Sequence, residues 1–494
     1  MRHLKNFREH LFNMSALGKK IKILLLACIV AIPLTSCFED MDDNISFSSL
    51  GVKDFVWKGM NLVYLYKPEV PDLANDRFTN DEDYNNYLNG FDTPEDLFES
   101  LKYLPDDVDR FSRIYSNYLD LQNLLSGTSL SNGLEFNLYF VPGSDSEIFG
   151  AITLVLNNSP AENAGLQRGQ IFRAINNQNL NLNNFNDLLE LNSYTLNFAD
   201  YDDNGTTEIA DDTVILNGET EDLTKVAYTE NPVYKTEVLS IDGINIGYLM
   251  YNRFTSNFNS ALNSAFSQFQ AEGVTELVLD LRYNGGGSVQ TAAYLGSMIT
   301  GQFNGEVFSK TFHNDNLQNL DTNYVFTNSI EGGGSINSLN LNKVYVLTTN
   351  NRTASASELV INSLKPYIDV VVIGQNTAGK TQASQIVYDS STLFTTEGIN
   401  PNHSYAMLPL IANSTNVNDQ LVPSDGLVPD IEIAESPLTF GVLGDVNEPL
   451  LAAAISEITL ADRPLQQIDN YSNSWQEIKS LKLESSIEKS MFIE

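Results

Sequence analysis

NRTASASELVINSLKPYIDVVVIGQNTAGK, residues 351–380, is the stretch that decides how the rest of the sequence is interpreted. It follows a short apolar run and contains apolar residues at helical spacing, namely Leu359, Val360, Leu364 and Tyr367. Ser355 therefore lies at a predicted strand-to-helix junction. The start of a helix presents free N–H groups and the positive end of the helix dipole, and both stabilise an oxyanion beside the serine. The stretch predicts a site for a nucleophilic serine.

A nucleophilic serine needs a base, and the sequence offers Lys380 for that role. Only His313 and His403 lie outside the N-terminal leader, and neither falls in a stretch that looks like a site. Residues 370–373 are predicted to form a fully buried strand, and the small-residue turn after it delivers Lys380. Burial disfavours the ammonium form and can lower a lysine pKa from about 10.4 toward neutrality. The residues alone leave open that Ser355 and Lys380 are two unrelated surface groups.

The same residues resemble the nucleophile motif of the S41 peptidases, the carboxyl-terminal processing proteases. In that family the catalytic serine lies three residues before a glutamate, and a lysine follows in a Gly-Lys turn. Here Ser355 and Glu358 have this spacing, and Lys380 follows the serine by 25 residues. The resemblance implies that Ser355, rather than Ser357, is the nucleophile. It also implies that Ala356 supplies one oxyanion N–H.

A glycine turn, residues 285–287, follows the predicted buried strand 276–281. Strand, turn and helix in succession predict an α/β core. Glycines let the backbone approach a substrate closely, and the resemblance implies that Gly287 is the second oxyanion donor, in a core of crotonase-like superfold. We interpret Asp280 and Arg282 as a structural ion pair.

After the lysine, the family commonly has a glutamine four residues on that orients it, whereas this chain has Ser384 there. Gln382 and Gln385 flank that position, so all three are candidates for orienting Lys380. Residues 426–430, GLVPD, resemble the closing motif of the family.

A competing motif, GQNTAGKT at residues 374–381, fits the phosphate-binding loop pattern and follows an apolar strand. A true phosphate loop opens a helix, whereas residues 382–396 are rich in β-branched and aromatic residues and predict two short strands. We therefore expect no nucleotide and no other cofactor.

A second competing motif fits a calcium loop in which aspartate replaces the usual last glutamate. Strands rather than helices are predicted on both of its sides, so a polar hairpin tip is favoured and we expect no metal site. Its residues are Asp200, Asp202, Asn204, Gly205 and Asp211.

Residues 128–217 are predicted to form a β-rich module that resembles a PDZ domain. Residues 159–166, SPAENAGL, resemble the PDZ helix-turn segment. Such a module can hold a peptide C-terminus on backbone N–H groups while the peptide adds as a strand. A module that only packs against the protease core remains the alternative. The residues that resemble the carboxylate-binding loop are Gly133, Leu134, Glu135 and Phe136.

The first 36 residues predict an export signal, with basic residues before an apolar run at 23–32 that is too short to span a bilayer. Small residues then precede Cys37, as in a lipoprotein cleavage box. We expect lipid on Cys37 and a location in a Gram-negative envelope, on the periplasmic or surface face of the outer membrane. An ordinary signal peptide is the alternative, and Met14 is a second possible start.

The composition limits the possible disulfides, binding partners and number of domains. The leader contains Cys28, so the mature chain keeps one cysteine and forms no internal disulfide. The whole chain has a net charge of −35, and removal of the +5 leader leaves about −40, which argues against nucleic acid and anionic lipid surfaces as partners. With 494 residues, of which 42% are hydrophobic, the chain is long enough for about three domains.

The predicted fold class is α/β multidomain. We expect no chemistry in the N-terminal helical domain, in which residues 108–125 predict a helix. The predicted divisions are a signal peptide (1–36), an acidic tether (37–51), the N-terminal helical domain (52–127), the PDZ-like domain (128–217), a linker (218–237), the S41 protease core (238–436) and a C-terminal helical segment and tail (437–494).

The resulting hypothesis is a lipid-anchored, extracytoplasmic serine endopeptidase that cleaves unfolded or C-terminal protein segments. The rival hypothesis is a catalytically weak or inactive lipoprotein that binds peptides or other ligands through the PDZ-like module and the S41-like cleft.

Overall fold

The computed structural model describes residues 51–206, 208–350, 352–460, 477–478 and 491–493. The predicted leader, Cys37 and the acidic tether up to residue 50 lie outside the described residues. Residues 78–87, which include most of helix α3 (Asp81–Asn89), belong to a separate compact unit in which the rings of Phe78 and Tyr84 lie 5.1 Å apart. Within the described ranges, no helix is both long and apolar enough to cross a membrane.

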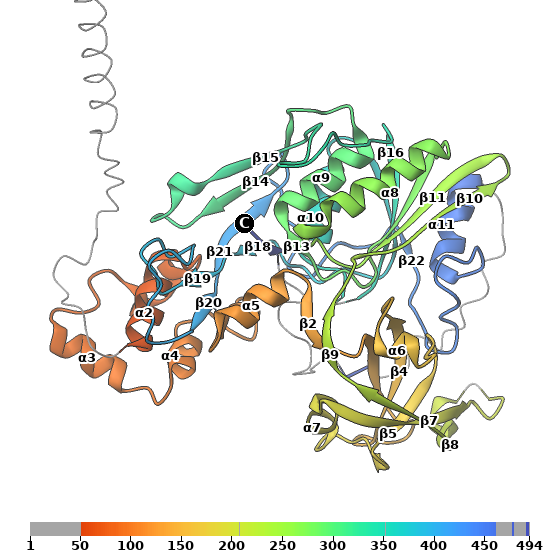
Figure 1. The fold of residues 1–494 in the computed structure, drawn as a ribbon, viewed down its shortest axis with the longest axis horizontal. Helices are drawn as coiled ribbons and strands as arrows, with labels where there is room; N and C mark the ends of the chain where they lie inside the picture. Colours follow the sequence, from red (N-terminus) through yellow and green to blue (C-terminus); the bar gives the residue numbers. More distant parts are fainter. Residues whose placement is uncertain (1–50, 207, 351, 461–476, 479–490, 494) are drawn as a thin grey trace, which may run out of the picture. The chain divides into compact units, whose positions relative to one another are not determined.

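The core contains a six-stranded sheet in which every neighbouring pair is parallel except the first (Figure 1). Parallel strands need crossover connections and are usually covered on both faces, which explains the unbroken apolar runs in the sequence. The strand order is β10 (Val233–Ile241), β11 (Ile244–Tyr251), β12 (Glu276–Asp280), β16 (Lys343–Thr348), β17 (Asp369–Gly374) and β22 (Ile431–Glu432).

Side chains of this sheet alternate between two apolar layers, as the two-residue period of a strand requires. Leu277 and Leu279 join the layer that contains α8 (Asn259–Ala271), α9 (Val289–Thr300) and α10 (Ala356–Leu364). Val278 and Leu347 join the opposite layer with α11 (Pro449–Thr459). Burial on both faces confirms the predicted α/β core and holds the carboxyl ends of its strands in place.

A second sheet brings together segments that are far apart in the sequence. Residues 382–396 carry two short strands, as predicted, so no helix follows Lys380 as a phosphate loop would require. These two strands are β18 (Gln382–Ser384) and β19 (Val387–Tyr388). The order of the second sheet is β13 (Gly287–Ser288), β23 (Met491–Phe492), β18, β21 (Leu410–Thr415), β14 (Val307–His313) and β15 (Thr322–Val325).

The N-terminal region is helical, with α2 (Val52–Val63), α4 (Pro94–Ser100) and α5 (Tyr118–Leu125). The prediction of one helix over residues 108–125 is wrong in its first half. The Asp109 carboxylate accepts the N–H groups of Phe111 (3.3 Å) and Ser112 (2.8 Å), and such local bonds compete with a helix. The chain then continues as β1 (Arg113–Tyr115), which pairs with β20 (Ala406–Leu408).

Residues 132–224, called the β-rich module below, have an apolar core of their own. The helix α7 (Phe185–Glu190) contributes to that core. The sheet of the module has the order β3 (Leu134–Phe140), β4 (Ile148–Val155), β5 (Ile171–Ile175), β7 (Ser193–Asp202) and β8 (Thr213–Thr224), so β3 is an end strand.

The segment 218–237, predicted as a linker, carries strands instead. It contains the second half of β8, all of β9 (Val226–Thr229) and the start of β10. Its polar residues misled the prediction because most of the second half of β8 is exposed. The segment that fits the calcium-loop pattern lies at the hairpin between β7 and β8, where a polar hairpin tip was predicted. No group of three metal-binding side chains occurs in the part of the chain that the structure describes.

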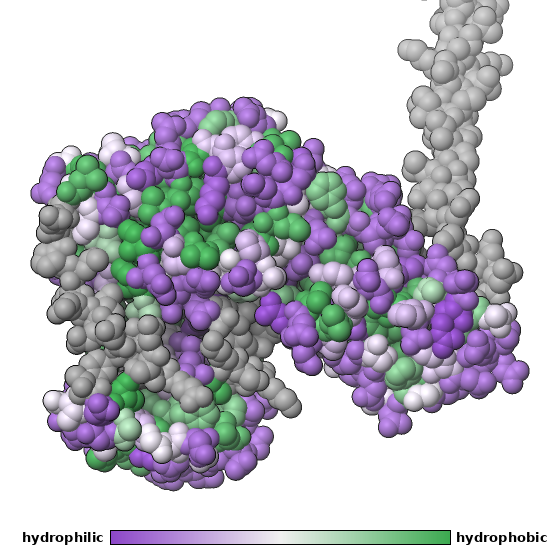
Figure 2. Space-filling model, turned by 180° about the vertical axis from the view of Figure 1, so that it is seen from behind, coloured by the Kyte–Doolittle hydropathy of each residue, from purple (hydrophilic) through white to green (hydrophobic). Residues whose placement is uncertain are grey.

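The surface reflects the composition of the chain. Hydrophilic residues cover most of the face drawn in Figure 2, and hydrophobic residues gather in smaller patches between them. Of the 494 residues, 63 are Asp or Glu and only 28 are Lys or Arg, and charged side chains of folded proteins lie mostly on the surface.

Candidate active site

Ser355 lies between β16 and α10, at the N-cap of the helix. Its backbone has φ 57° and ψ −109°, a conformation that non-glycine residues rarely adopt and that often marks functional sites. Ala356 opens α10, so its N–H has no acceptor within the helix. Both residues are fully buried. The predicted strand-to-helix junction is therefore present.

A single buried carboxylate joins this nucleophile turn to the turn that carries the lysine. Glu358 accepts the backbone N–H groups of Ser355 (2.7 Å), Gly379 (2.7 Å) and Lys380 (3.0 Å), as well as the hydroxyl of Thr377. Burial raises the pKa of Glu358, and these hydrogen bonds act in the opposite direction. In the sequence, Glu358 served only to define the motif spacing. Its hydrogen bonds to both turns were not predicted.

Lys380 is completely buried. Burial lowers the pKa of its amine to about 7, although the nearby Asp109 carboxylate acts in the opposite direction. Its Nζ lies 4.4 Å from the centre of the Phe111 ring. A lysine with such a pKa is about half neutral at pH 7, so it can accept a proton there.

The expectation of no chemistry in the N-terminal region is wrong, because that region covers the lysine. Phe111, whose ring lies over Nζ, and Asp109, whose charge acts on the lysine, come from the turn before β1. The Tyr64 hydroxyl donates to the Asp109 carboxylate (2.6 Å), and the Ser112 hydroxyl accepts the N–H of Leu410 (2.9 Å). A signal was available, since the sequence DRFS at 109–112 resembles a family segment.

The closing motif braces the lysine turn from its other side. Gly379 has φ 77°, and a Cβ atom there would lie 2.1 Å from the backbone oxygen of Ser424, so only glycine fits. The N–H of Leu427 donates to the Thr377 hydroxyl at 2.8 Å. Leu427 of the closing motif therefore helps to position the turn that carries Lys380, through its bond to Thr377.

The three candidates for orienting the lysine occupy different surroundings. The side chain of Gln382 is hydrogen-bonded to Tyr66. Ser384 is fully buried, and its hydroxyl has no hydrogen-bond partner among the described residues. Gln385 is half-buried between β18 and β19. The group that the structure shows over Nζ is instead the ring of Phe111.

The glycine turn and the nucleophile loop are held together by Asn284. Its carbonyl oxygen accepts the N–H of Ala354 (3.1 Å) and the hydroxyl of Ser357 (3.0 Å). Gly287, three residues on, has φ 135°, and a Cβ atom there would lie 2.3 Å from the backbone oxygen of Phe254. The glycine is thus required by the fold. Asn284 was missed because no local pattern marks it.

The predicted ion pair between Asp280 and Arg282 is present and is part of a larger buried network. Arg282 Nε lies 2.9 Å from an oxygen of Asp280, and Nη1 lies 2.7 Å from Glu448 and 2.9 Å from Glu435. Burial alone would raise the pKa of Glu435, but the guanidinium groups of Arg168 and Arg282 outweigh it and lower the pKa to about 2. The network extends to the β-rich module, which supplies Arg168.

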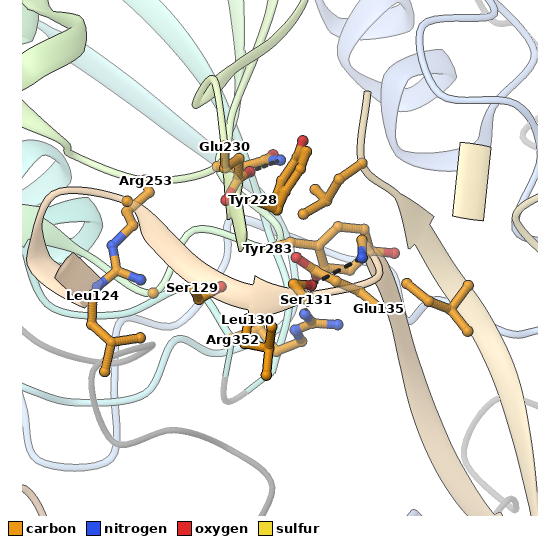
Figure 3. A pocket seen from close by; sticks show the side chains of 16 residues that line it. Leu124, Ser129, Leu130, Ser131, Glu135, Tyr228, Glu230, Arg253, Tyr283 and Arg352 are labelled. Carbon is orange, nitrogen blue, oxygen red and sulfur yellow. Dashed lines mark hydrogen bonds and ion pairs between the residues drawn. The ribbon is translucent and has the colours of Figure 1, made fainter. Parts of the chain in front are cut away.

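A pocket of about 400 Å³ lies where the β-rich module meets the glycine turn. Figure 3 shows Glu135, Tyr283 and Arg352 gathered on its wall. Arg352 forms an ion pair with Glu135, and its guanidinium lies 4.7 Å from the centre of the Tyr283 ring. Gly285 lines the same pocket, so the pocket reaches the predicted oxyanion turn.

The predicted carboxylate-binding loop is divided between this pocket and the interior of the module. Gly133, Leu134 and Glu135 line the pocket, whereas the ring of Phe136 packs 5.3 Å from that of Phe172. The N–H groups of Gly133 and Leu134 donate to the side chains at 131 (2.9 Å) and 132 (3.1 Å). A carboxylate would have to displace these contacts to use those two groups.

Comparison with known proteins places this site in a family. Residues 245–432 match the model of peptidase family S41, and residues 51–113 match that of the peptidase S41 N-terminal domain. The chain is 23% identical over 386 residues to the "Carboxyl-terminal-processing protease" of Picosynechococcus sp., with 76% of this chain and 81% of the relative covered. It is 25% identical over 280 residues to the chloroplastic C-terminal processing peptidase of Tetradesmus obliquus, with 54% and 55% covered.

The solved structures agree with this assignment. A crystal structure from Bacteroides fragilis NCTC 9343, described as a protease of family S41, is 29% identical and has a TM-score of 0.66. The match covers 83% of this chain and 98% of that one. The chain therefore belongs to peptidase family S41 and is a serine-type peptidase of the carboxyl-terminal processing group.

Proposed function

We propose that this protein is an exported, lipid-anchored serine endopeptidase that uses Ser355 and Lys380 as its catalytic dyad. The observation that carries the proposal is the complete burial of Lys380, with a pKa of about 7, in a turn that Glu358 ties to the nucleophile turn. An exposed lysine is protonated at neutral pH and cannot serve as a base.

In the proposed mechanism, Ser355 Oγ attacks the carbonyl carbon of the scissile peptide bond and the neutral amine of Lys380 takes its proton. The N–H groups of Gly287 and Ala356 hold the oxyanion. The Lys380 ammonium then returns the proton to the leaving amine. Water hydrolyses the acyl-enzyme in the second half of the reaction, with Lys380 acting again as the base.

We further propose that the substrates are unfolded or C-terminal protein segments. The names of the relatives describe processing of carboxyl termini. Support within this chain comes from the β-rich module, where β3 is an end strand and residues 133–135 line a pocket that reaches Gly285. A peptide can add to such an edge as a further strand, with side-chain pockets providing specificity. The module is then a PDZ-like receptor for the substrate.

The anchor rests on the leader sequence alone. Cys37, the proposed site of lipid, is followed by acidic residues that would hold the enzyme away from the membrane surface. Mass spectrometry of the native protein tests this, since it should find a lipid-modified Cys37 as the first residue. An unmodified N-terminus elsewhere would instead establish an ordinary secreted protease.

The proteolytic function is tested with the soluble form that starts at residue 38 and with unfolded protein substrates. Ser355→Ala should lose essentially all hydrolysis, because the nucleophile is gone. Ser357→Ala is the comparison variant, because it removes the bond from Ser357 Oγ to the carbonyl of Asn284 but leaves the proposed nucleophile in place, so it should keep part of the hydrolysis. Equal hydrolysis by wild type and Ser355→Ala would contradict the proposal. Peptide binding without hydrolysis by the wild type would support a binding lipoprotein instead.

A further inference from the structure

Residues 491–493 lie as an extended segment inside the second sheet, where no strand was predicted. Met491 pairs in parallel with Gly287 of β13 on one side and with Ala383 of β18 on the other. The N–H of Ile493 donates to the carbonyl of Ser384 at 2.9 Å. Figure 1 marks this end of the chain beside β18 and β13.

The two flanking strands carry the two halves of the proposed catalytic machinery. β13 begins at Gly287, the proposed oxyanion donor, and β18 begins two residues after Lys380. An extended substrate that presents a carbonyl to Ser355 has to lie near both of these groups. Residues 491–493 lie between the two strands that carry these groups.

The side chain of Met491 fills an apolar space beside the nucleophile helix. It is fully buried and belongs to the same apolar cluster as Val289, Ala356 and Ala383. Phe492 is also buried. Methionine adapts its shape to irregular gaps, so this space is suited to a long, unbranched apolar side chain opposite Gly287.

A second part of the same segment lies on the β-rich module. Glu477 forms an antiparallel bridge with Tyr139 on the end strand β3, and the N–H of Ile478 donates to the carbonyl of Leu138 at 3.0 Å. The Ile478 side chain packs against the core of the module. This is strand addition to an open sheet edge, the same mode of binding that we propose for the substrate.

Residues 477–478 thus lie on the edge of β3, and residues 491–493 lie between β13 and β18. Met491 follows Ile478 by 13 positions, a stretch that reaches at most about 43–47 Å when extended. Two linked contacts of this kind raise each other's effective concentration, so each of them can be weak by itself.

We propose that residues 491–493, together with residues 477–478, are a built-in strand ligand of this enzyme, which fills the substrate slot until a protein substrate displaces it. The proposal rests on the proposed proteolytic function, since it identifies the slot as the substrate site. It also defines the preferred ligand as an extended segment with a methionine-like side chain opposite Gly287.

The test uses the full chain with Met491→Asp, because a carboxylate cannot be buried in the apolar space and the segment must leave it. We expect kcat/KM on an unfolded protein substrate to rise by about 10-fold or more, as expected when one of two linked contacts is lost. Met491→Leu keeps an apolar side chain there and should stay near the wild type. Ile478→Asp acts at the edge of β3, outside the catalytic core, and should give a smaller rise.

A binding measurement separates this proposal from the proteolytic one. The probe is a fluorescein-labelled peptide of residues 475–494, and its binding is measured by fluorescence anisotropy. It should bind the full-length double variant Ser355→Ala, Met491→Asp. It should bind the single variant Ser355→Ala much more weakly. The unlabelled peptide should inhibit Met491→Asp competitively. A peptide with the same Met491→Asp change should do neither.

The results that would overturn the proposal are specific. Equal peptide binding to both Ser355→Ala proteins would show that the slot is not filled by the segment. An unchanged or lower kcat/KM for both Met491→Asp and Ile478→Asp would show that the segment does not inhibit. Release of a fragment cut between Met491 and Phe492, found by mass spectrometry of the wild type, would identify a substrate rather than a displaceable ligand. If no variant hydrolyses any substrate, the proteolytic function fails, while the anisotropy result still decides whether the segment occupies the slot.

Discussion

The nucleophile turn, residues 349–358, and the lysine turn, residues 374–380, share one carboxylate but obtain their chemistry differently. Ser355 is positioned by its own neighbours in the sequence, through the start of α10 and the bond from its N–H to Glu358. Lys380 owes its pKa of about 7 to burial, and the ring over its Nζ belongs to Phe111, some 270 residues earlier in the sequence. Local structure therefore positions the nucleophile, whereas the assembly of distant segments lowers the pKa of the lysine.

The largest loss of activity is expected when the base is removed. Lys380→Ala should lower kcat/KM by about 10²–10⁴, the usual contribution of a general base. Lys380→Arg should be as inactive, because arginine keeps the positive charge but does not lose its proton in proteins. Both are measured with unfolded protein substrates. Substantial activity in Lys380→Arg would contradict the role of the lysine as a base.

Next in size is the loss of the carboxylate that joins the two turns. Glu358→Gln replaces one accepting oxygen by an amide NH₂ group, which faces N–H donors that then lack an acceptor. Each buried unsatisfied group costs about 1–3 kcal/mol, so the free energy of unfolding in urea should fall by about that amount or more. Misplaced turns should also reduce kcat by up to about 10².

Thr377→Val is the matched control for that change. It removes the hydroxyl that donates to Glu358 and accepts from Leu427, while the three backbone donors to Glu358 remain. Its effect on kcat and on stability should be clearly smaller than that of Glu358→Gln. If the two variants behave alike, the carboxylate is not what joins the turns.

A smaller change should move the pH profile without removing any catalytic group. In the wild type, kcat/KM should rise with pH around 7 and level off above about pH 8, because the neutral amine forms above its pKa. Phe111→Ala exposes Lys380 to water, which favours the ammonium and raises its pKa. The rise in kcat/KM should then move to higher pH, and activity at pH 7 should fall by about fivefold if the pKa of Lys380 rises to about 8.

Phe111→Leu separates the shielding of Nζ from water from the attraction between the cation and the π face of the ring. Leucine still covers Nζ but has no π face to favour a cation, so the pKa of Lys380 should stay low or fall slightly. The measurement is the pH dependence of kcat/KM for both variants. A profile that is the same in wild type and Phe111→Ala would show that the N-terminal region does not control the base.

The smallest effect is expected from Asp109→Asn. The Asp109 carboxylate raises the pKa of Lys380 and so opposes the effect of burial. Removing its charge should lower that pKa, and the rise in kcat/KM should move to lower pH, in the direction opposite to Phe111→Ala. A shift to higher pH in Asp109→Asn would contradict this account of the charges around the lysine.

Much of the candidate site was predictable because its signals are local. The period of apolar residues predicted the α/β core, and the resemblance to the S41 peptidases selected Ser355, Gly287 and Lys380 within the small-residue turns. Such patterns carry no information about which distant segment covers a turn. The coverage by residues 109–113 and the tie through Asn284 were therefore missed.

The sequence by itself determined the features that depend on neighbouring residues, namely the buried core strands and the helix that starts at Ala356. Tertiary structure alone decided the protonation of Lys380, because a pKa follows from burial and charge contributed by remote parts of the chain. It also decided the place of Met491, since a strand of two residues is too short to show any period and acquires its partners only when β13 and β18 lie beside it.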